Sequence, residues 1–152
     1  REQLELKNEA REATFNRSRN LIRLCANSIR AAHRAEFQQA RELLQQANAL
    51  ATEMCLAVAE HPDLYFAGYT QDALKEYAEA SITYAVITDE PVPTPAALQV
   101  EPPAYLNGLA EAIGELRRHV LDLIREEKLA RAEHVLAVMD EAFWLRWTSP
   151  AP

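Results

Sequence analysis

Two pairs of glutamates in this sequence are spaced so that each pair lies on one side of a helix. Glu76 and Glu79 are three residues apart, and Glu111 and Glu115 are four apart. Side chains at these spacings share a helix face. If the two helices run antiparallel, the carboxylates can meet at one point and offer the oxygen ligands that Mg²⁺ or Mn²⁺ binds. A cation held there would activate water and stabilise an in-line displacement at phosphorus.

The same acid pairs also fit a solvated surface, because both point away from the Leu and Ile stripes of their helices. Gly108 and Gly114 flank Glu111. A glycine inside a helix costs about 1 kcal/mol relative to alanine, so each one indicates the close approach of a helix or a ligand. Packing between helices is the simpler explanation of the two glycines.

A row of arginines is the second feature that could do chemistry. The segment Ala13–Ala35 contains no acidic residue. Successive residues of a helix are rotated by about 100°. Four arginines of this segment therefore lie within one sector of roughly 60°. We call them the arginine stripe, and they are Arg19, Arg23, Arg30 and Arg34. Guanidinium groups bind phosphate and stack on bases, so the stripe suits single-stranded nucleic acid. A solvated face, or one paired with acids of a neighbouring helix, is the alternative.

Other kinds of site are poorly supported by the sequence. None of the four histidines stands in a Glu-x-x-His pattern, which argues against a di-iron bundle. No phosphate-binding loop or nucleophile elbow occurs. Cys25 and Cys55 lie in apolar helical patterns, which favours reduced core thiols over a disulfide or a metal site.

The elements that carry these residues are predicted to be helices. The 152-residue chain suits one domain, and its 49% of hydrophobic residues lean on Ala and Leu with only three Gly. Apolar residues at three-and-four spacing predict long helices. Their approximate ranges are 4–33, 37 to the turn at 61–63, 70–88, 104–126 and 129–147.

The segment between the third and fourth helices breaks this pattern. Five of the eight prolines lie between residues 91 and 103, which predicts an ordered loop without helix. Neither half looks able to bury its helices alone, so we expect one domain. We therefore predict an all-α, single-domain bundle of about five to six antiparallel helices over 1–147 and a frayed tail over 148–152.

Charge and hydropathy limit the partners and the cellular location that we expect for the protein. The formal charge of −7 argues against indiscriminate binding of polyanions. No apolar stretch is long enough to cross a bilayer, and the first residues lack a secretory signal, so we expect a cytoplasmic protein with no membrane partner. Phe143, Trp144 and Trp147 place large apolar surface near one end, which favours contacts between subunits of a homo-oligomer.

Three stretches resemble the translin family, which includes translin and its associated factor X, Trax. They match in order and spacing, and they are residues 19–34, 72–80 and 108–118. The resemblance covers roughly Leu4 to Phe143. It implies an all-helical, translin-like subunit that assembles into hollow oligomers, often octamers, which take single-stranded RNA or DNA inside.

The resemblance also implies roles for the acids. Trax-like members cut RNA with Mg²⁺ held by acids on two helices, whereas translin-like members mainly bind. Glu76 and Glu79 match the Glu-x-x-Glu of the Trax-like helix, Glu115 matches the Glu of a Gly-Glu-Leu motif, and Glu111 stands in place of an Asp. These four would be the catalytic metal ligands of a Trax-like endoribonuclease, and the arginine stripe would hold its RNA.

Three departures or alternatives stay open. Ala35 stands where the family has Gly, which predicts a more helical turn between the first two helices. A non-catalytic RNA- or DNA-binding subunit, or a helical scaffold, would carry the same fold. An all-α nucleotide pyrophosphohydrolase also uses Glu-x-x-Glu, but pairs it with Glu-x-x-Asp, whereas the second pair here is Glu-x-x-x-Glu.

Overall fold

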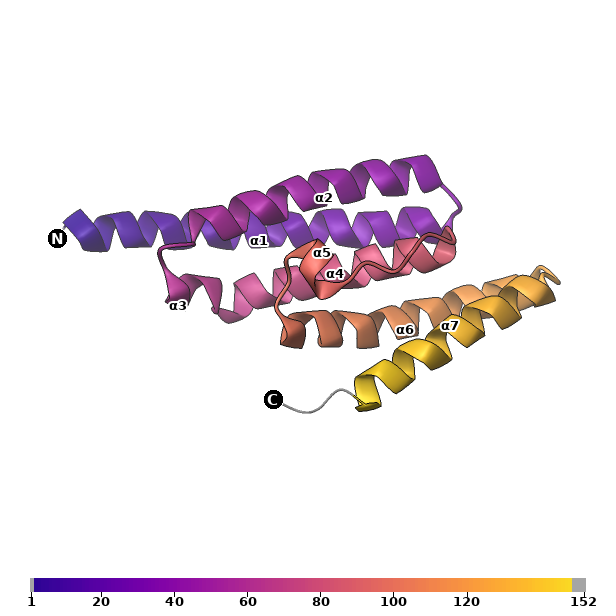
Figure 1. The fold of residues 1–152 in the computed structure, drawn as a ribbon. Coiled ribbons are helices and arrows are strands. Elements are labelled where there is room, and N and C mark those ends of the chain that lie inside the picture. Colours follow the sequence, from indigo (N-terminus) through magenta and orange to yellow (C-terminus); the bar gives the residue numbers. More distant parts are fainter. Residues whose placement is uncertain (1, 149–152) are drawn as a thin grey trace.

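The predicted all-α bundle is confirmed by the structure, a computed structural model that describes the backbone of residues 2–148 and the side chains of residues 3–142 and 144. Every regular element in that range is a helix (Figure 1). In order they are α1 (Glu2–His33), α2 (Phe37–Ala57), α3 (Pro62–Tyr65), α4 (Gly68–Ile87), α5 (Pro95–Leu98), α6 (Pro102–Arg125) and α7 (Leu129–Thr148). The predicted frayed tail lies outside the described residues, except for Thr148, which ends α7.

The proline-rich segment differs from its prediction, because the one-turn helix α5 forms inside it. Pro95 is compatible with a helix at its first position, where the missing N–H has no partner to lose. The hydroxyl of Thr94 caps this turn by accepting a hydrogen bond from the backbone N–H of Ala97 at 3.1 Å. By the same logic α6 begins at Pro102, slightly before the predicted start.

The turn between α1 and α2 also differs from its prediction. Ala35 adopts the left-handed conformation with φ of 60° instead of continuing the helix. The N–H groups of Ala35 and Glu36 then donate to the carbonyls of Ala32 and Ala31 at 3.0 and 2.9 Å. These two bonds satisfy the last carbonyls of α1, so the turn is tight although it lacks the glycine that usually favours it.

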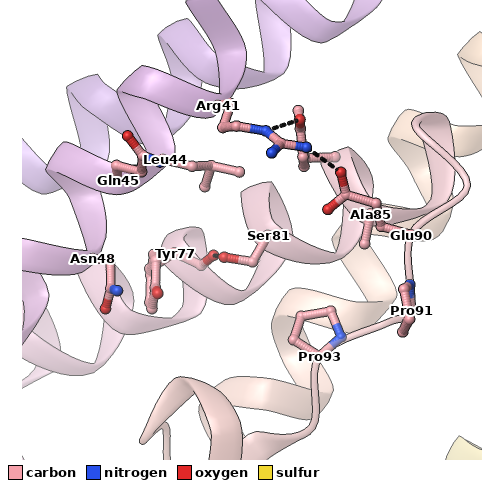
Figure 2. Close-up of a pocket in the computed structure, with 11 residues that line it drawn as sticks. Arg41, Leu44, Gln45, Asn48, Tyr77, Ser81, Ala85, Glu90, Pro91 and Pro93 are labelled. Carbon is pink, nitrogen blue, oxygen red and sulfur yellow. Dashed lines mark hydrogen bonds and ion pairs between the residues drawn. The ribbon is translucent and has the colours of Figure 1, made fainter. Parts of the chain in front are cut away.

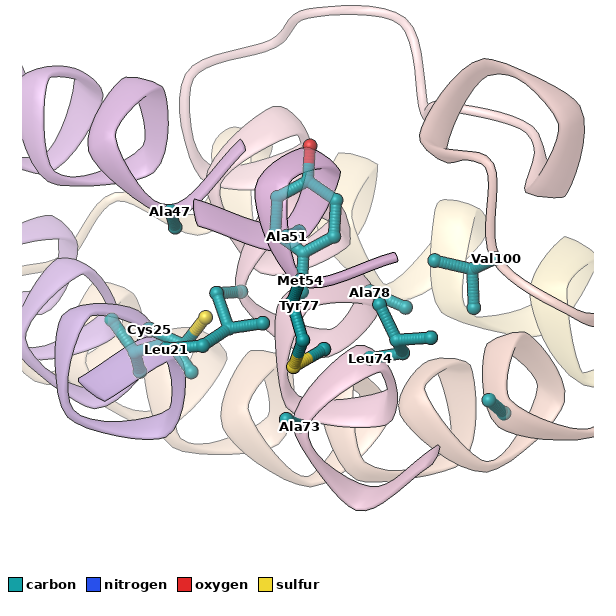
Figure 3. Packing of buried hydrophobic residues seen from close by; sticks show 13 residues of the cluster. Leu21, Cys25, Ala47, Ala51, Met54, Ala73, Leu74, Tyr77, Ala78 and Val100 are labelled. Atoms are coloured by element: carbon teal, nitrogen blue, oxygen red, sulfur yellow. The ribbon is translucent and has the colours of Figure 1, made fainter. Parts of the chain in front are cut away.

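Helix α4 lies at the centre of the bundle, beneath the antiparallel pair α1 and α2 and alongside α6 (Figure 1). Every residue from Tyr77 to Ile87 on α4 is buried. Figure 3 shows the core between α1, α2 and α4, where Leu21, Met54 and Leu74 are at most 1% exposed. Both cysteines are free, and Cys25 is fully buried in this core, as predicted for a core thiol.

Helix α6 approaches α4 most closely at Gly108. A Cβ at this position would lie 2.6 Å from the carbonyl oxygen of Lys75 and 2.9 Å from Cβ of Ala78. Gly114 has nothing within 4 Å of the same construction. Of the two glycines that flank Glu111, Gly108 is therefore required by helix packing and Gly114 is not.

Helices α6 and α7 form an outer hairpin that leaves apolar side chains exposed. Leu121, Ile124, Leu129 and Leu136 are each at least 45% exposed, and Trp144 is 63% exposed. The side chains of Phe143 and Trp147 lie outside the described residues, and the predicted contact between subunits stays a prediction. No helix in the described range is long and apolar enough to cross a membrane.

We predict opposite effects of adding a methyl group at the two glycines. Gly108→Ala should lower the free energy of unfolding by about 1–3 kcal/mol, because the methyl group meets backbone atoms of α4. Gly114→Ala should raise it by up to about 1 kcal/mol through helix propensity. Urea unfolding followed by circular dichroism measures both, and equal effects would contradict the contact at Gly108.

Candidate functional site

Three of the predicted metal ligands meet between α4 and α6. Carboxylate oxygens of Glu76, Glu79 and Glu111 lie within 4.8 Å of one another, and we call this group the carboxylate cluster. Glu79 is only 7% exposed, whereas the Glu111 side chain is 45% exposed. Gly108 stands one turn before Glu111, so the close contact of the two helices brings the carboxylates together.

Burial and neighbouring charge favour the protonated form of one member of the cluster, Glu79. Burial, the negative charge of Glu76 and a hydrogen bond to Glu111 raise the pKa of Glu79 to about 8. The side chain therefore keeps its proton in most molecules at neutral pH. Burial and like charge both disfavour the ionised form, and an added cation would reverse the second effect.

Lys75 completes the cluster, and our sequence analysis did not assign it to the site. Its Nζ donates to Oε1 of Glu111 at 2.9 Å and lies 3.2 Å from Oε1 of Glu76. The bond to Glu111 raises the pKa of Lys75, so the ammonium is retained. Lys75 precedes Glu79 by four residues, and this helical spacing was the available signal that the two share a side of α4.

Glu115, the fourth predicted ligand, has a different partner. Its Oε2 lies 2.5 Å from Nε2 of His33, at the end of α1. Nδ1 of His33 is buried and has no hydrogen-bond partner among the described residues. The contact between His33 and Glu115 therefore ties the end of α1 to α6 through one ring nitrogen alone.

Helix α1 forms the third wall of the site. Burial raises the pKa of the Cys25 thiol, and the negative charges of Glu76 and Glu79 raise it further. The His33 ring also faces His119 of α6, with 6.4 Å between ring centroids. Burial and the nearby His33 lower the pKa of His119. The carboxylate cluster thus lies where α1, α4 and α6 meet, and α1 was not predicted to contribute to it.

Three members of the arginine stripe, Arg19, Arg23 and Arg30, are exposed on α1, and the exposed Arg34 follows the end of that helix. Arg34 is paired with Glu36 through two hydrogen bonds of 3.0 and 2.9 Å. The other three have no carboxylate partner in the described part of the chain. Arg19 lies over the Phe15 ring, while Arg23 and Arg30 donate to the amide oxygens of Asn20 and Asn27.

The stripe runs beside the site without pointing into it. At about 100° per residue, Arg30 lies about 60° around α1 from His33, which contacts Glu115. The buried Cys25 lies much further around the helix. The stripe therefore lies on the solvent side of α1, whereas Cys25 faces the acids of α4.

A hollow of about 350 Å³ lies on the side of α4 that faces α2, away from the carboxylate cluster (Figure 2). Arg41 crosses it and donates to the Tyr84 hydroxyl at 3.0 Å and to Glu90. Both bonds tie α2 to the end of α4 and to the segment that follows. The charge of Arg41 is thereby already paired, and we assign this hollow a structural role.

Comparison with solved structures finds two close matches to the chain. The complex of AfC3PO with duplex RNA is 33% identical and superposes with a TM-score of 0.90, covering 99% of this chain and 78% of the other. A crystal structure of AfC3PO is 31% identical with a TM-score of 0.88, covering 99% and 79%. The structure of apo-NeC3PO, 20% identical with a TM-score of 0.68 and covering 97% and 94%, shares the fold.

Sequence comparison alone gives less. The uncharacterized protein MJ0175 of Methanocaldococcus jannaschii is 30% identical over 146 residues, which cover 90% of this chain. The chain spans 61% of the length of that relative. No known family model matches the sequence.

The raised pKa of Glu79 predicts how stability depends on pH. In the unfolded chain Glu79 ionises near its ordinary pKa of 4.5, but in the folded protein it holds its proton up to about 8. Stability should therefore fall as the pH rises from about 4.5 through 8. Glu79→Gln cannot ionise, so at pH 9 its free energy of unfolding should exceed that of wild type by more than about 1 kcal/mol.

Urea unfolding in EDTA at several pH values measures this difference without a bound cation. Glu133→Gln, an exposed change on α7, is the matched control and should follow the wild-type curve. Parallel curves for Glu79→Gln and wild type would mean that Glu79 ionises normally in the folded protein.

Proposed function

The chain belongs to the translin family, since C3PO is the complex of translin and Trax, and from this membership we propose that it binds RNA and cuts it as a metal-dependent endoribonuclease of Trax-like type. The observation that carries the proposal is the carboxylate cluster beside a row of arginines that lack carboxylate partners. The acidic residues gather between α4 and α6 with Lys75 as their basic partner, while the arginines lie along α1. An ordinary solvated surface would intersperse them.

The residues of the cluster fit a hard divalent cation. Glu76, Glu79 and Glu111 offer carboxylate oxygens, which Mg²⁺ and Mn²⁺ prefer, and their mutual repulsion would be relieved by such an ion. The bound ion would activate water and offset negative charge at the phosphate. Glu115 stands beside the cluster, where His33 orients its carboxylate. We propose that Glu115 also binds the ion directly.

The arginine stripe would hold the phosphates of the strand. Guanidinium groups on an exposed helix contact the backbone without reading its sequence, so binding should tolerate many sequences. AfC3PO was solved with duplex RNA. We propose single-stranded RNA, and also allow single-stranded DNA, as the ligand here because Phe15 stands exposed beneath Arg19 and can stack on an unpaired base. We also propose a homo-oligomer that forms through the apolar outer side of α6 and α7. The resemblance to the translin family implies up to eight subunits.

We expect Mg²⁺ or Mn²⁺ to raise the melting temperature of the protein, more strongly at pH 8 than at pH 6 because the proton on Glu79 competes with the ion. The double variant Glu76→Gln plus Glu79→Gln should lose this shift. It should also lose cleavage of labelled single-stranded RNA while still binding it. Lys75→Gln should enlarge the shift, since it removes the ammonium that occupies Glu76 and Glu111.

Glu133→Gln serves as the control, and light scattering should give the assembly state of each sample. Cleavage by the purified double variant at the wild-type rate would show that these carboxylates are not catalytic. RNA binding without cleavage by wild type would instead identify a non-catalytic member of the family.

The arginine stripe gives a separate prediction for binding. Arg19→Ala, Arg23→Ala and Arg30→Ala should each weaken RNA binding and reduce the slope of log affinity against log salt by about one unit or less. Arg17→Ala is the matched control on the same helix, because Arg17 is already paired with Glu53 at 3.0 Å. Arg34→Ala should have a smaller effect, since Glu36 neutralises its charge. Fluorescence anisotropy over a salt series measures the slopes. Equal slopes in all variants would mean that the stripe is a solvated face that does not contact phosphates.

A further inference from the structure

A cavity of about 620 Å³ opens between α1 and the start of α4, away from the carboxylates. It is lined by Asn8, Arg11, Glu12, Phe15, Asn16 and Tyr69. Its volume falls within the range of small-molecule sites. Nothing in the proposed metal centre uses these residues.

The cavity lies on the same side of α4 as the carboxylate cluster. Tyr69 precedes Glu76 by seven residues, which is two helical turns and about 10 Å along the axis. The exposed Asp72 stands between them on the same face. On the α1 side, Arg19 of the arginine stripe lies 6.0 Å from the centre of the Phe15 ring. One strand could therefore reach the stripe, the cavity and the cluster together.

The lining suits a flat and uncharged ligand. The Phe15 ring is 46% exposed and meets Tyr69 edge to face, with 5.6 Å between centroids, so ring surface remains open for stacking. Arg11 and Glu12 carry opposite charges, which disfavours a phosphate as the occupant. The side-chain amides of Asn8 and Asn16 make no hydrogen bond within the described residues, so donors and acceptors are available.

Tyr69 supplies the observation that is hardest to explain by packing. Its hydroxyl is buried and has no hydrogen-bond partner among the described residues. A buried hydroxyl without a partner is destabilising unless a ligand or water satisfies it. A nucleobase that parts the contact between the Phe15 and Tyr69 rings would stack on Phe15 and give the Tyr69 hydroxyl a partner.

We propose that this cavity binds one unpaired nucleobase of an RNA strand whose phosphates lie along the arginine stripe. The inference rests on the proposed function, because it needs RNA on the protein. It gives the proposed single-strand preference a binding site: a base can enter the cavity only when it is not paired. Stacking on Phe15 tolerates any base, and the amide groups and the Tyr69 hydroxyl contact its edge.

The test compares binding of a short single-stranded RNA and a duplex of the same length, in EDTA to prevent cleavage. Phe15→Leu keeps an apolar side chain but removes the stacking surface, and should weaken single-strand binding about tenfold. Its duplex binding should change less than about twofold, because phosphate contacts by the stripe remain. Phe37→Leu, which alters a ring of similar exposure at the start of α2, is the matched control and should change neither.

Unchanged single-strand binding by Phe15→Leu, or an equal loss for single strand and duplex, would overturn the base pocket and leave RNA binding intact. Failure of wild type to bind either RNA would overturn the proposed function and the pocket with it. If Phe15→Leu does not fold, Tyr69→Phe decides. It should weaken single-strand binding severalfold without lowering the melting temperature, and wild-type affinity in that variant would overturn the pocket.

Discussion

The contact between α4 and α6 at Gly108 is the constraint on which the site depends. With no side chain at this position, the backbone of α6 lies against the Lys75–Glu79 turn of α4. One turn further along α6, Glu111 then reaches the two acids of α4. The same approach buries Glu79, and this burial is the main cause of its raised pKa. A packing requirement in one residue thus sets both the geometry and the protonation of the cluster.

The site residues were predictable as far as they share a helix. Glu76 with Glu79, and the arginine stripe, follow from spacing alone. The meeting of Glu111 with the first pair was expected between antiparallel helices, but α4 and α6 run parallel (Figure 1) because the long segment that carries α5 returns the chain to the start of α4. The pairing of Glu115 with His33 did not, because the partners are 82 residues apart and no local pattern joins them. Spacing also could not distinguish a solvated face of α4 from the face that packs against α6.

The fold shows the same division between local and tertiary information. The long helices lie where their apolar periodicity predicts them, since each must bury one stripe. The errors fall at helix ends, where single residues decide. Proline generally breaks helices, but Pro95 and Pro102 stand at the first position of α5 and α6. Alanine generally favours helices, but Ala35 lies in the turn that ends α1. At such positions the hydrogen bonds of the terminal turn outweigh residue preference.

The carboxylates of the resting site already have positive partners, which a divalent ion would have to displace. At neutral pH the carboxylates already share a proton on Glu79 and the ammonium of Lys75, which together supply two positive charges. A divalent ion that displaces the proton and moves the Lys75 side chain aside would raise the net charge of the protein by one, because the ammonium stays attached to the chain. Its uptake would then acidify the medium by up to one proton per site, and the loaded protein would repel an approaching polyanion less than the empty one.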